Sequence, residues 1–384
     1  MIPYGKQSID QTDIDAVVNV LRSDWLTQGP KVPAFEDAVT KYCEVKHGVA
    51  VNSATSALHI ACLALDVGKG DIVWTSPISF VASANCALYC GAKIDFVDID
   101  LNTGNMSVFE LEKKLILAKK NNCLPKVIIP VHLAGQSCDM QAIHKLAHKY
   151  DFKIIEDASH AIGAKYLDKP VGNCEFSDIC IFSFHPVKII TSAEGGMAVT
   201  NSDNLAKRLK RLRSHGLTTD PTEMTEPSHG PWYYQQIELG FNYRMTDLHA
   251  ALGMSQLSKV DEFVNQRHFL AKTYDTHLDL NLIRPLQQSN TCYSAYHLYI
   301  VQLTDSDIEQ HKNVITQLRA AGIIGHLHYI PIHLQPFYKA MGFSAGDFPN
   351  AEKYYQRAIT LPLHPTLQDH EVHLVINTLH QILN

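Results

Sequence analysis

The feature that most limits the fold is a regular alternation of short apolar runs with amphipathic segments, which begins at Val49. The runs are rich in Val, Ile and Phe, as buried strands are, and the segments between them place apolar residues at helical spacing. Such alternation predicts right-handed crossovers and a mostly parallel sheet with helices on both faces. The expected order is VAVN, a helix over 54–65, IVWTS, a helix over 80–90, KIDFVDI, a helix over 107–120, KVIIPVH, a helix over 139–150 and FKIIED.

Both ends of the chain depart from this alternation. Before it, the spacing of apolar residues predicts two helices, over 8–24 and 32–44. After it we expect, in order, a long loop over 218–236, a long helix over 246–278, and an α+β layer with helices over 309–321 and 369–383. A chain of 384 residues exceeds the usual size of a single core. We therefore predict an N-terminal segment and large domain over 1–250 and a small C-terminal domain over 251–384.

Charge and cysteine content exclude several classes of protein. The net charge is −6, the pI is about 6.4 and no long basic run occurs, so neither nucleic acid nor an anionic membrane is an expected partner. No apolar run reaches the roughly 18 residues of a membrane span, and the start MIPYGKQ lacks the features of a signal peptide. Nine scattered cysteines without a CxxC pair indicate reduced thiols. We expect a cytoplasmic protein without a metal site.

A single lysine, Lys188, stands in the stretch FSFHPVKIITSAEGG, just beyond the apolar run DICIFSF that predicts a strand. A lysine amine in partly apolar surroundings has a lowered pKa, and the neutral amine can then attack an aldehyde to form a Schiff base. Taken alone, Lys188 is better explained as a solvated residue of a connecting loop. Its interpretation as a reactive amine therefore depends on neighbouring segments.

Two other segments carry the partners that such a lysine needs. The run FKIIED ends in Asp157, and a carboxylate at the carboxyl end of a strand in an alternating β/α chain points into the ligand crevice. There it can hold a pyridine nitrogen protonated, which makes pyridoxal 5′-phosphate (PLP) an electron sink. The segment VNSATSALHIACLAL opens a helix at Thr55 and Ser56, whose hydroxyls and N–H groups can bind a phosphate dianion. An ordinary helix cap explains these small residues equally well, so only the combination indicates a PLP enzyme.

A set of segments extends this pattern over nearly the whole chain: NSATSAL, TSPISFVASAN, EDASHAIGA, FSFHPVK with TSAEGG, RSHG and GFNYRMTDLHAALG. The set resembles the fold-type I, PLP-dependent nucleotide-sugar aminotransferases of the DegT/DnrJ/EryC1/StrS family. The resemblance implies an aspartate aminotransferase-like α/β fold, PLP as cofactor and two half-reactions with ping-pong kinetics. It also implies that Lys188 is the Schiff-base partner and later the general base, and that Asp157 holds the ring nitrogen.

The resemblance assigns further residues to the cofactor. Phe80 would stack on the pyridine face, although a core aromatic is an alternative. His160 stands where many family members have glutamine, and it would contact the ring hydroxyl or support the aspartate; a structural histidine is the alternative. Ser183 would reach the phosphate. Asn242 matches an asparagine that reaches the phosphate from the neighbouring subunit, which implies a homodimer with shared active sites; a simple turn residue is the alternative.

Within the family, the segments YGKQSID, SDWLTQGPKVPAFE, PISFVASANCALYCGA and HLHYIPIH are most similar to the branch of pseudaminic acid biosynthesis. That similarity implies a UDP-linked 4-keto-6-deoxy sugar as amino acceptor and L-glutamate as donor, released as 2-oxoglutarate. The sugar-binding residues that it implies are Tyr4, Asp24, Trp25, Leu26, Thr27, Ala54, Ser183, His185, Asn242, His326, Leu327, His328 and Tyr329.

Three rival interpretations remain. The acceptor could be another nucleotide-linked 4-keto sugar, of the perosamine or 4-amino-arabinose type. A related branch dehydrates sugars and carries histidine in place of the Schiff-base lysine, which Lys188 argues against. A PLP-binding protein without turnover is disfavoured because Lys188, Asp157 and Ser183 are all present.

Overall fold

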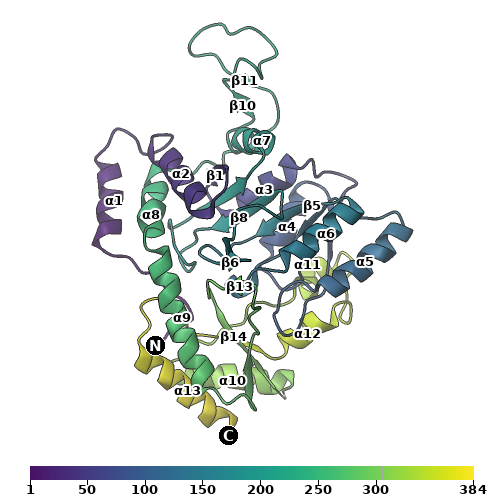
Figure 1. The fold of residues 1–384 in the computed structure, drawn as a ribbon, viewed down its shortest axis with the longest axis vertical. Helices are drawn as coiled ribbons and strands as arrows, with labels where there is room; N and C mark the ends of the chain where they lie inside the picture. The colour runs from purple at the N-terminus through teal and green to yellow at the C-terminus, as the bar shows by residue number, and fades with distance from the viewer. Residues whose placement is uncertain (305) are drawn as a thin grey trace.

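A seven-stranded sheet forms the centre of the protein (Figure 1), in the order β1-β9-β8-β5-β4-β2-β3. The computed structural model describes residues 1–304 and 306–384. Within this sheet only β9 runs antiparallel to its neighbours, which confirms the predicted parallel architecture. The strands are β1 (His47–Val51), β2 (Ile72–Thr75), β3 (Lys93–Phe96), β4 (Val127–Ile129), β5 (Lys153–Asp157), β8 (Ile179–Ser183) and β9 (Gly196–Thr200).

Helices cover both faces of this sheet because alternate residues of each strand point to opposite sides. In β8, Ile179 and Ile181 join the core beneath α3, α4 and α7, whereas Cys180 and Phe182 face α2 and α8. Helices α5 and α6 continue the second layer. Both faces are buried, which is why these strands read as continuous apolar runs. The helices are α2 (Lys31–Cys43), α3 (Ala54–Ala64), α4 (Ala82–Tyr89), α5 (Val108–Lys120), α6 (Met140–Tyr150), α7 (Asp203–Arg213) and α8 (Asp247–Leu257).

A second, three-stranded antiparallel sheet, β12-β14-β15, lies in the C-terminal part and forms its own core with three helices and Ile2. The elements of the C-terminal part are α9 (Val260–His277), β12 (Ile283–Pro285), β14 (Tyr299–Leu303), α10 (Ile308–Ala320), α11 (Pro336–Lys339), α12 (Pro349–Tyr355), β15 (Ala358–Leu361) and α13 (Asp369–Leu383). The three helices of this core are α9, α10 and α13. The short 3₁₀ turns are η1 (Leu133–Gly135) and η2 (Ile332–Leu334), and a small sheet joins β6 (Lys165–Tyr166), β7 (Lys169–Pro170) and β13 (Cys292–Tyr293). The division into domains at residue 250 stays a proposal, and that residue lies inside α8. Among the described residues no helix is both long and apolar enough to cross a membrane.

The long helix expected over 246–278 is instead two helices, α8 and α9, which separate at Ser258 and Lys259. The Ser258 hydroxyl donates to the carbonyl of Ser255 at 2.7 Å, a local bond that competes with the helical ladder. No glycine or proline marks this position, so the periodicity of the sequence did not indicate the break.

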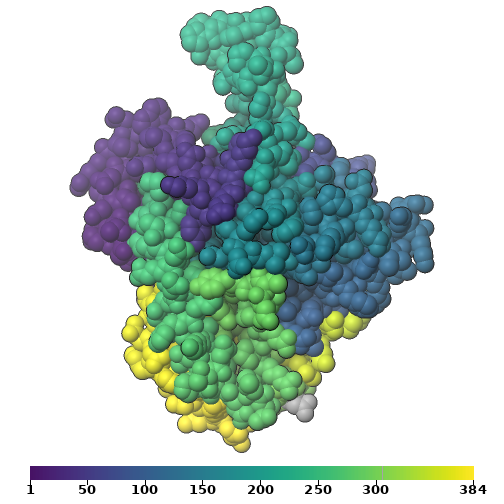
Figure 2. Space-filling model, in the orientation of Figure 1, coloured from purple at the N-terminus to yellow at the C-terminus, as the bar shows by residue number. Residues whose placement is uncertain are grey.

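Residues 217–240 form an arm that projects away from the body of the molecule (Figures 1 and 2). Its base is a two-stranded ribbon of β10 (Leu217–Thr218) and β11 (Gln235–Gln236), and the loop between them carries the exposed side chains of Trp232 and Tyr234. The long loop that we predicted over 218–236 is thus present, with short paired ends.

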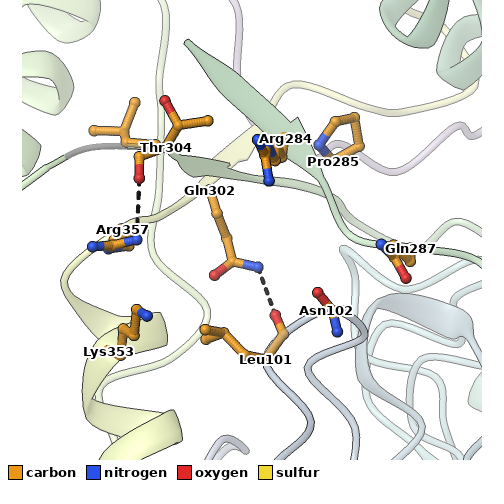
Figure 3. A pocket seen from close by; sticks show the side chains of 10 residues that line it. Leu101, Asn102, Arg284, Pro285, Gln287, Gln302, Thr304, Lys353 and Arg357 are labelled. Atoms are coloured by element: carbon orange, nitrogen blue, oxygen red, sulfur yellow. Dashed lines mark hydrogen bonds between the residues drawn. The ribbon is translucent and has the colours of Figure 1, made fainter. Parts of the chain in front are cut away.

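The two sheets meet at a seam that hydrogen bonds hold together. The Gln302 amide of β14 donates to the carbonyl of Leu101 at 2.7 Å, beside a hollow of about 280 Å³ (Figure 3). Nearby, both carboxylate oxygens of Asp98 accept N–H bonds at 2.9 Å from the first turn of α12, at Asn350 and Ala351. A carboxylate at a helix N-terminus accepts bonds from the free N–H groups and interacts favourably with the positive end of the helix dipole. This contact therefore fixes α12 against the large sheet.

A buried carboxylate, Asp13 of α1 (Gln11–Leu21), ties the N-terminal helix to the junction of α8 and α9. It accepts bonds from Ser255 Oγ at 2.6 Å, Gln256 Nε2 at 2.7 Å and Lys259 Nζ at 2.8 Å. Lys259 Nζ also binds the Asp10 carboxylate at 2.7 Å and Gln256 Nε2 also donates to the carbonyl of Ser8 at 2.8 Å, so Asp13 is the shared acceptor of a small polar network.

We expect Asp13→Ala to lower the free energy of unfolding by about 2 kcal/mol, because the buried Gln256 amide, the half-buried Lys259 ammonium and the Ser255 hydroxyl each lose an acceptor. The exposed Asp15 of the same helix provides the control, and Asp15→Ala should change this free energy by less than about 0.5 kcal/mol. Urea unfolding followed by circular dichroism measures both. Equal effects of the two substitutions would contradict the role of Asp13.

Candidate active site

A cavity of about 420 Å³ opens beside the carboxyl ends of β5 and β8. This is the edge of a parallel sheet at which ligands bind in α/β folds. The N-terminal segment, several segments of the large sheet region and residues 326–329 contribute to the walls. The predicted site residues that line it are Tyr4, Ala54, Thr55, Phe80, Asp157, His160, Ser183, His185, Lys188, His326, His328 and Tyr329.

Lys188 lies in the turn that follows β8, and its backbone N–H donates to the carbonyl of His185 at 2.9 Å. Part of its side chain still contacts solvent within the cavity, yet the surrounding protein desolvates the amine and lowers the pKa of Lys188 to about 8. The negative charge of Asp157 opposes this shift without cancelling it. The surroundings of the amine therefore keep a substantial fraction of it in the neutral form near physiological pH.

Asp157 ends β5 and is almost fully buried. Its Oδ2 accepts a bond from Ser83 Oγ at 2.6 Å, and its Oδ1 accepts the backbone N–H of Ser159 at 3.1 Å. These two donors fix the carboxylate orientation toward the cavity. The preceding residue, Glu156, has its carboxylate bonded to His132 Nε2 at 2.8 Å, as the alternation of a strand requires.

Sequence reasoning missed Ser83. It follows Phe80 by three positions in TSPISFVASAN, a segment that the resemblance already included, but its contact with Asp157 joins residues 74 positions apart. Only the pairing of β2, β4 and β5 brings the two segments together.

The N-terminus of α3 forms another wall. Ser53 caps the helix by accepting the Ser56 N–H at 3.1 Å, and Ser56 Oγ donates to Asn52 at 2.7 Å, so Ser56 is satisfied locally and does not line the cavity. The first-turn N–H groups of Ala54 and Thr55 have no acceptor within the helix and are suited to an anion.

Gly196, at the start of β9, passes directly over this helix end. A Cβ at Gly196 would lie 2.5 Å from the backbone nitrogen of Ala54, so any side chain there would displace the helix N-terminus. The close approach, the free N–H groups and the hydroxyls of Thr55 and Ser183 form a cradle that suits a phosphate dianion. Together with Asp157 and the Lys188 amine, the donor set fits PLP.

Aromatic and histidine side chains form the remaining wall. The Tyr4 ring centroid lies 5.0 Å from that of His326 and 5.0 Å from that of His328. His328 Nδ1 is hydrogen-bonded to Thr360 Oγ1 at 2.9 Å, and burial lowers the pKa of His328 to about 3. The N-terminal segment is held in place because the Leu363 N–H donates to the Tyr4 carbonyl at 3.0 Å.

His297 also lines the cavity, although no motif in the sequence indicated it. Its ring centroid lies 4.4 Å from that of His160, and burial lowers the pKa of His297 well below the usual range for histidine. Among the described residues its Nδ1 is buried without a hydrogen-bond partner. Across those same residues no cluster of His, Cys, Asp or Glu is arranged to hold a metal ion.

Seven of the predicted residues do not line the cavity of this chain: Ser56, Asp24, Trp25, Leu26, Thr27, Leu327 and Asn242. Trp25 and Leu26 are about half exposed, and Thr27 pairs with Thr246 through an isolated β-bridge. Asn242 pairs with Ser214 at the base of the arm. Roles for these residues remain predictions.

A phosphate cradle at the edge of a parallel sheet, together with a buried carboxylate and a lysine amine of lowered pKa, is the set of features expected of the PLP-dependent transferases of fold-type I. Comparison with known proteins narrows the class. The DegT/DnrJ/EryC1/StrS aminotransferase family model matches residues 7–380, so the chain belongs to this family.

Individual relatives agree with this assignment. A Campylobacter jejuni protein (strain 81-176) named UDP-4-amino-4,6-dideoxy-N-acetyl-beta-L-altrosamine transaminase is 39% identical, with 100% of this chain and 98% of that protein covered. Helicobacter pylori PseC, described as an aminotransferase involved in the biosynthesis of pseudoaminic acid, superposes with a TM-score of 0.91 at 32% identity over 100% and 99% of the two chains. Streptococcus pneumoniae Spr1654, described as a putative sugar aminotransferase in its PMP form, gives the same TM-score, identity and coverage of the two chains.

These comparisons confirm the predicted fold and cofactor. The chain is a PLP-dependent sugar aminotransferase.

The lowered pKa of Lys188 predicts how the apo-enzyme captures PLP at different pH. The amine attacks only when neutral, so the rate constant of capture should rise with pH and level off above a midpoint near 8. An ordinary lysine would give a midpoint above 10. Rapid-mixing absorbance measurements of PLP incorporation give this profile.

Asp157→Asn is the matched variant, because it removes the one charge that favours the protonated amine. Its midpoint should fall below that of the wild type. A wild-type midpoint above 10, or an upward shift in the variant, would contradict the electrostatic description of the site.

Proposed function

We propose that this enzyme converts UDP-2-acetamido-2,6-dideoxy-β-L-arabino-hex-4-ulose to UDP-4-amino-4,6-dideoxy-N-acetyl-β-L-altrosamine, with L-glutamate as amino donor, in pseudaminic acid biosynthesis. The observation that carries the proposal is the full-length similarity to the Campylobacter jejuni transaminase of that name. The free state of all nine cysteines supports an action in the cytoplasm.

In this proposal the cofactor is held at three points by this chain. The N–H groups at the start of α3, with Thr55 and Ser183, would bind the phosphate, and the Asp157 carboxylate would hold the pyridine nitrogen protonated. Phe80 provides an aromatic surface at the mouth of the cavity, where 60% of its area is exposed. When bound, PLP supplies an aldehyde that captures amines and a ring that withdraws electrons from the adjacent carbon.

The protein's part in the reaction is binding, orientation and proton transfer. As a neutral amine, Lys188 Nζ would take a proton from the donor's α-carbon, and as an ammonium it would deliver that proton to the carbon that was the cofactor's aldehyde carbon; its lowered pKa suits both directions near neutral pH. Ser83 and the Ser159 N–H keep Asp157 oriented throughout. Tyr4, His326 and His328 form the wall that we assign to the sugar.

The substrate assignment is tested by incubating the PLP-loaded enzyme and L-glutamate with a panel of UDP- and dTDP-linked 4-keto sugars, with NMR analysis of the products. We expect the UDP-linked β-L-arabino-hexulose to be aminated with a kcat/KM at least about tenfold above that of the others, since one specific polar contact is worth about this factor. Lys188→Ala serves as the control for enzyme-dependent turnover and should form no product. Preference for a perosamine-type or 4-amino-arabinose-type precursor would replace the proposed substrate.

We also propose that the active unit is a homodimer in which Asn242 completes the phosphate site of the partner. This residue lies at the base of the projecting arm and outside its own chain's cavity, and the arm exposes Trp232 and Tyr234, aromatics of the kind enriched in interfaces. A two-fold axis would make the exchange reciprocal.

Subunit mixing tests this arrangement. Lys188→Ala and Asn242→Ala chains, each impaired alone, should regain activity when mixed, because one site of each heterodimer then carries neither defect. A tag on one variant verifies exchange, and mixing each variant with itself is the control. Verified exchange without recovery would rule out the shared site.

A further inference from the structure

The hydrogen bonds around His160 fix which of its ring nitrogens carries a proton. The backbone N–H of Ala134 donates to His160 Nδ1 at 3.3 Å, and since an amide nitrogen only donates, Nδ1 is the acceptor. Burial lowers the pKa of His160 well below its usual range, so the ring is neutral. Its single proton therefore resides on Nε2.

This tautomer determines the direction of the neighbouring hydroxyl. His160 Nε2 lies 3.1 Å from Tyr329 Oη, and with a proton on Nε2 the tyrosine oxygen must accept. The hydroxyl proton of Tyr329 cannot then point at His160. Among the described residues Tyr329 Oη has no other hydrogen-bond partner, and both residues line the cavity. The free O–H donor is thus available to a bound ligand.

We infer that Tyr329 donates a hydrogen bond to an electron-rich oxygen bound in the cavity, and that His160 is a positioning residue that orients this donor. Two oxygens share the required chemistry: the oxygen of the hydroxyl group on the cofactor's pyridine ring, and the keto oxygen of the sugar. The first source needs only PLP and glutamate. The second rests on the function proposed above, so the two can fail independently.

The surroundings of Tyr329 favour such a role. Burial raises the pKa of its hydroxyl, with a further contribution from the charge of Asp157, so the group keeps its proton at neutral pH. The Phe80 ring lies 6.4 Å away between centroids, and the titratable groups that face Tyr329 are Asp157, Tyr4, Tyr354, His160 and His328. A donor in a desolvated site is worth more than one in water.

Tyr329→Phe removes the hydroxyl and keeps the ring. If the cofactor oxygen is the acceptor, the affinity of the apo-enzyme for PLP falls about tenfold, and the pH midpoint of the bound cofactor's visible absorbance moves up by about one unit. If the keto oxygen is the acceptor, these values stay unchanged. The glutamate half-reaction is then normal, while the sugar half-reaction slows about tenfold or more.

Tyr274→Phe is the matched control, because its buried hydroxyl donates to the carbonyl of Pro362 at 2.9 Å, and it does not line the cavity. It should lower thermal stability and leave all four measurements unchanged. Wild-type values for Tyr329→Phe in PLP affinity, absorbance and both half-reactions would overturn the inference.

A double-mutant cycle tests the part played by His160. His160→Leu should lower the affected quantity, which is either the PLP affinity or the rate of the sugar half-reaction, by less than Tyr329→Phe does. The double variant should show no greater loss than Tyr329→Phe alone. His160→Gln keeps an N–H donor and should restore most of the loss; it also serves if the leucine variant is unstable. Fully additive losses, or no rescue by glutamine in a folded variant, would overturn the positioning role.

Discussion

The active site depends first on the parallel register of β5 and β8. Asp157, the last residue of β5, is paired with Ile181, and the next N–H, of Ala158, donates to the Ile181 carbonyl at 2.9 Å, while β8 continues two residues further, to Ser183. That ladder places the turn bearing Lys188 beside the carboxylate that ends β5. A slip of one residue would turn Asp157 toward the opposite face and bury a charge in the apolar layer. The chemistry of the cavity is therefore a consequence of backbone hydrogen bonding.

The cavity also shows how burial distributes charge. Its lysine and aspartate form one polar centre, whereas His160, His297 and His328 are held neutral because desolvation lowers their pKa values. A wall of neutral imidazoles can donate and accept hydrogen bonds without adding positive charge next to the amine. This arrangement leaves the pKa of Lys188 to be set by burial and by Asp157 alone.

The sequence predicted the sheet, its helices and the positions of Lys188 and Asp157 because each depends on local periodicity and on the topology of alternating elements. It did not indicate Ser83 or His297, whose roles arise from contacts between segments far apart in the chain. The break between α8 and α9 was missed because neither glycine nor proline marks it, although the Ser258 hydroxyl bonds to the carbonyl of Ser255 there. Tyr4, His326 and His328 were named only through the family resemblance, and the structure shows their rings in contact although Tyr4 and the histidines are far apart in the chain.

The amino-acid composition of the projecting arm allows proteases to show whether the arm is exposed or covered. Loops that leave the body of a protein are the usual sites of limited cleavage. Residues 218–240 contain neither lysine nor arginine, but they include Trp232, Tyr233 and Tyr234 in succession. Trypsin therefore cannot cut the arm, whereas chymotrypsin cuts after aromatic residues and can do so wherever the tip is uncovered. Sensitivity to one enzyme and not to the other reports whether this segment is free or covered in solution.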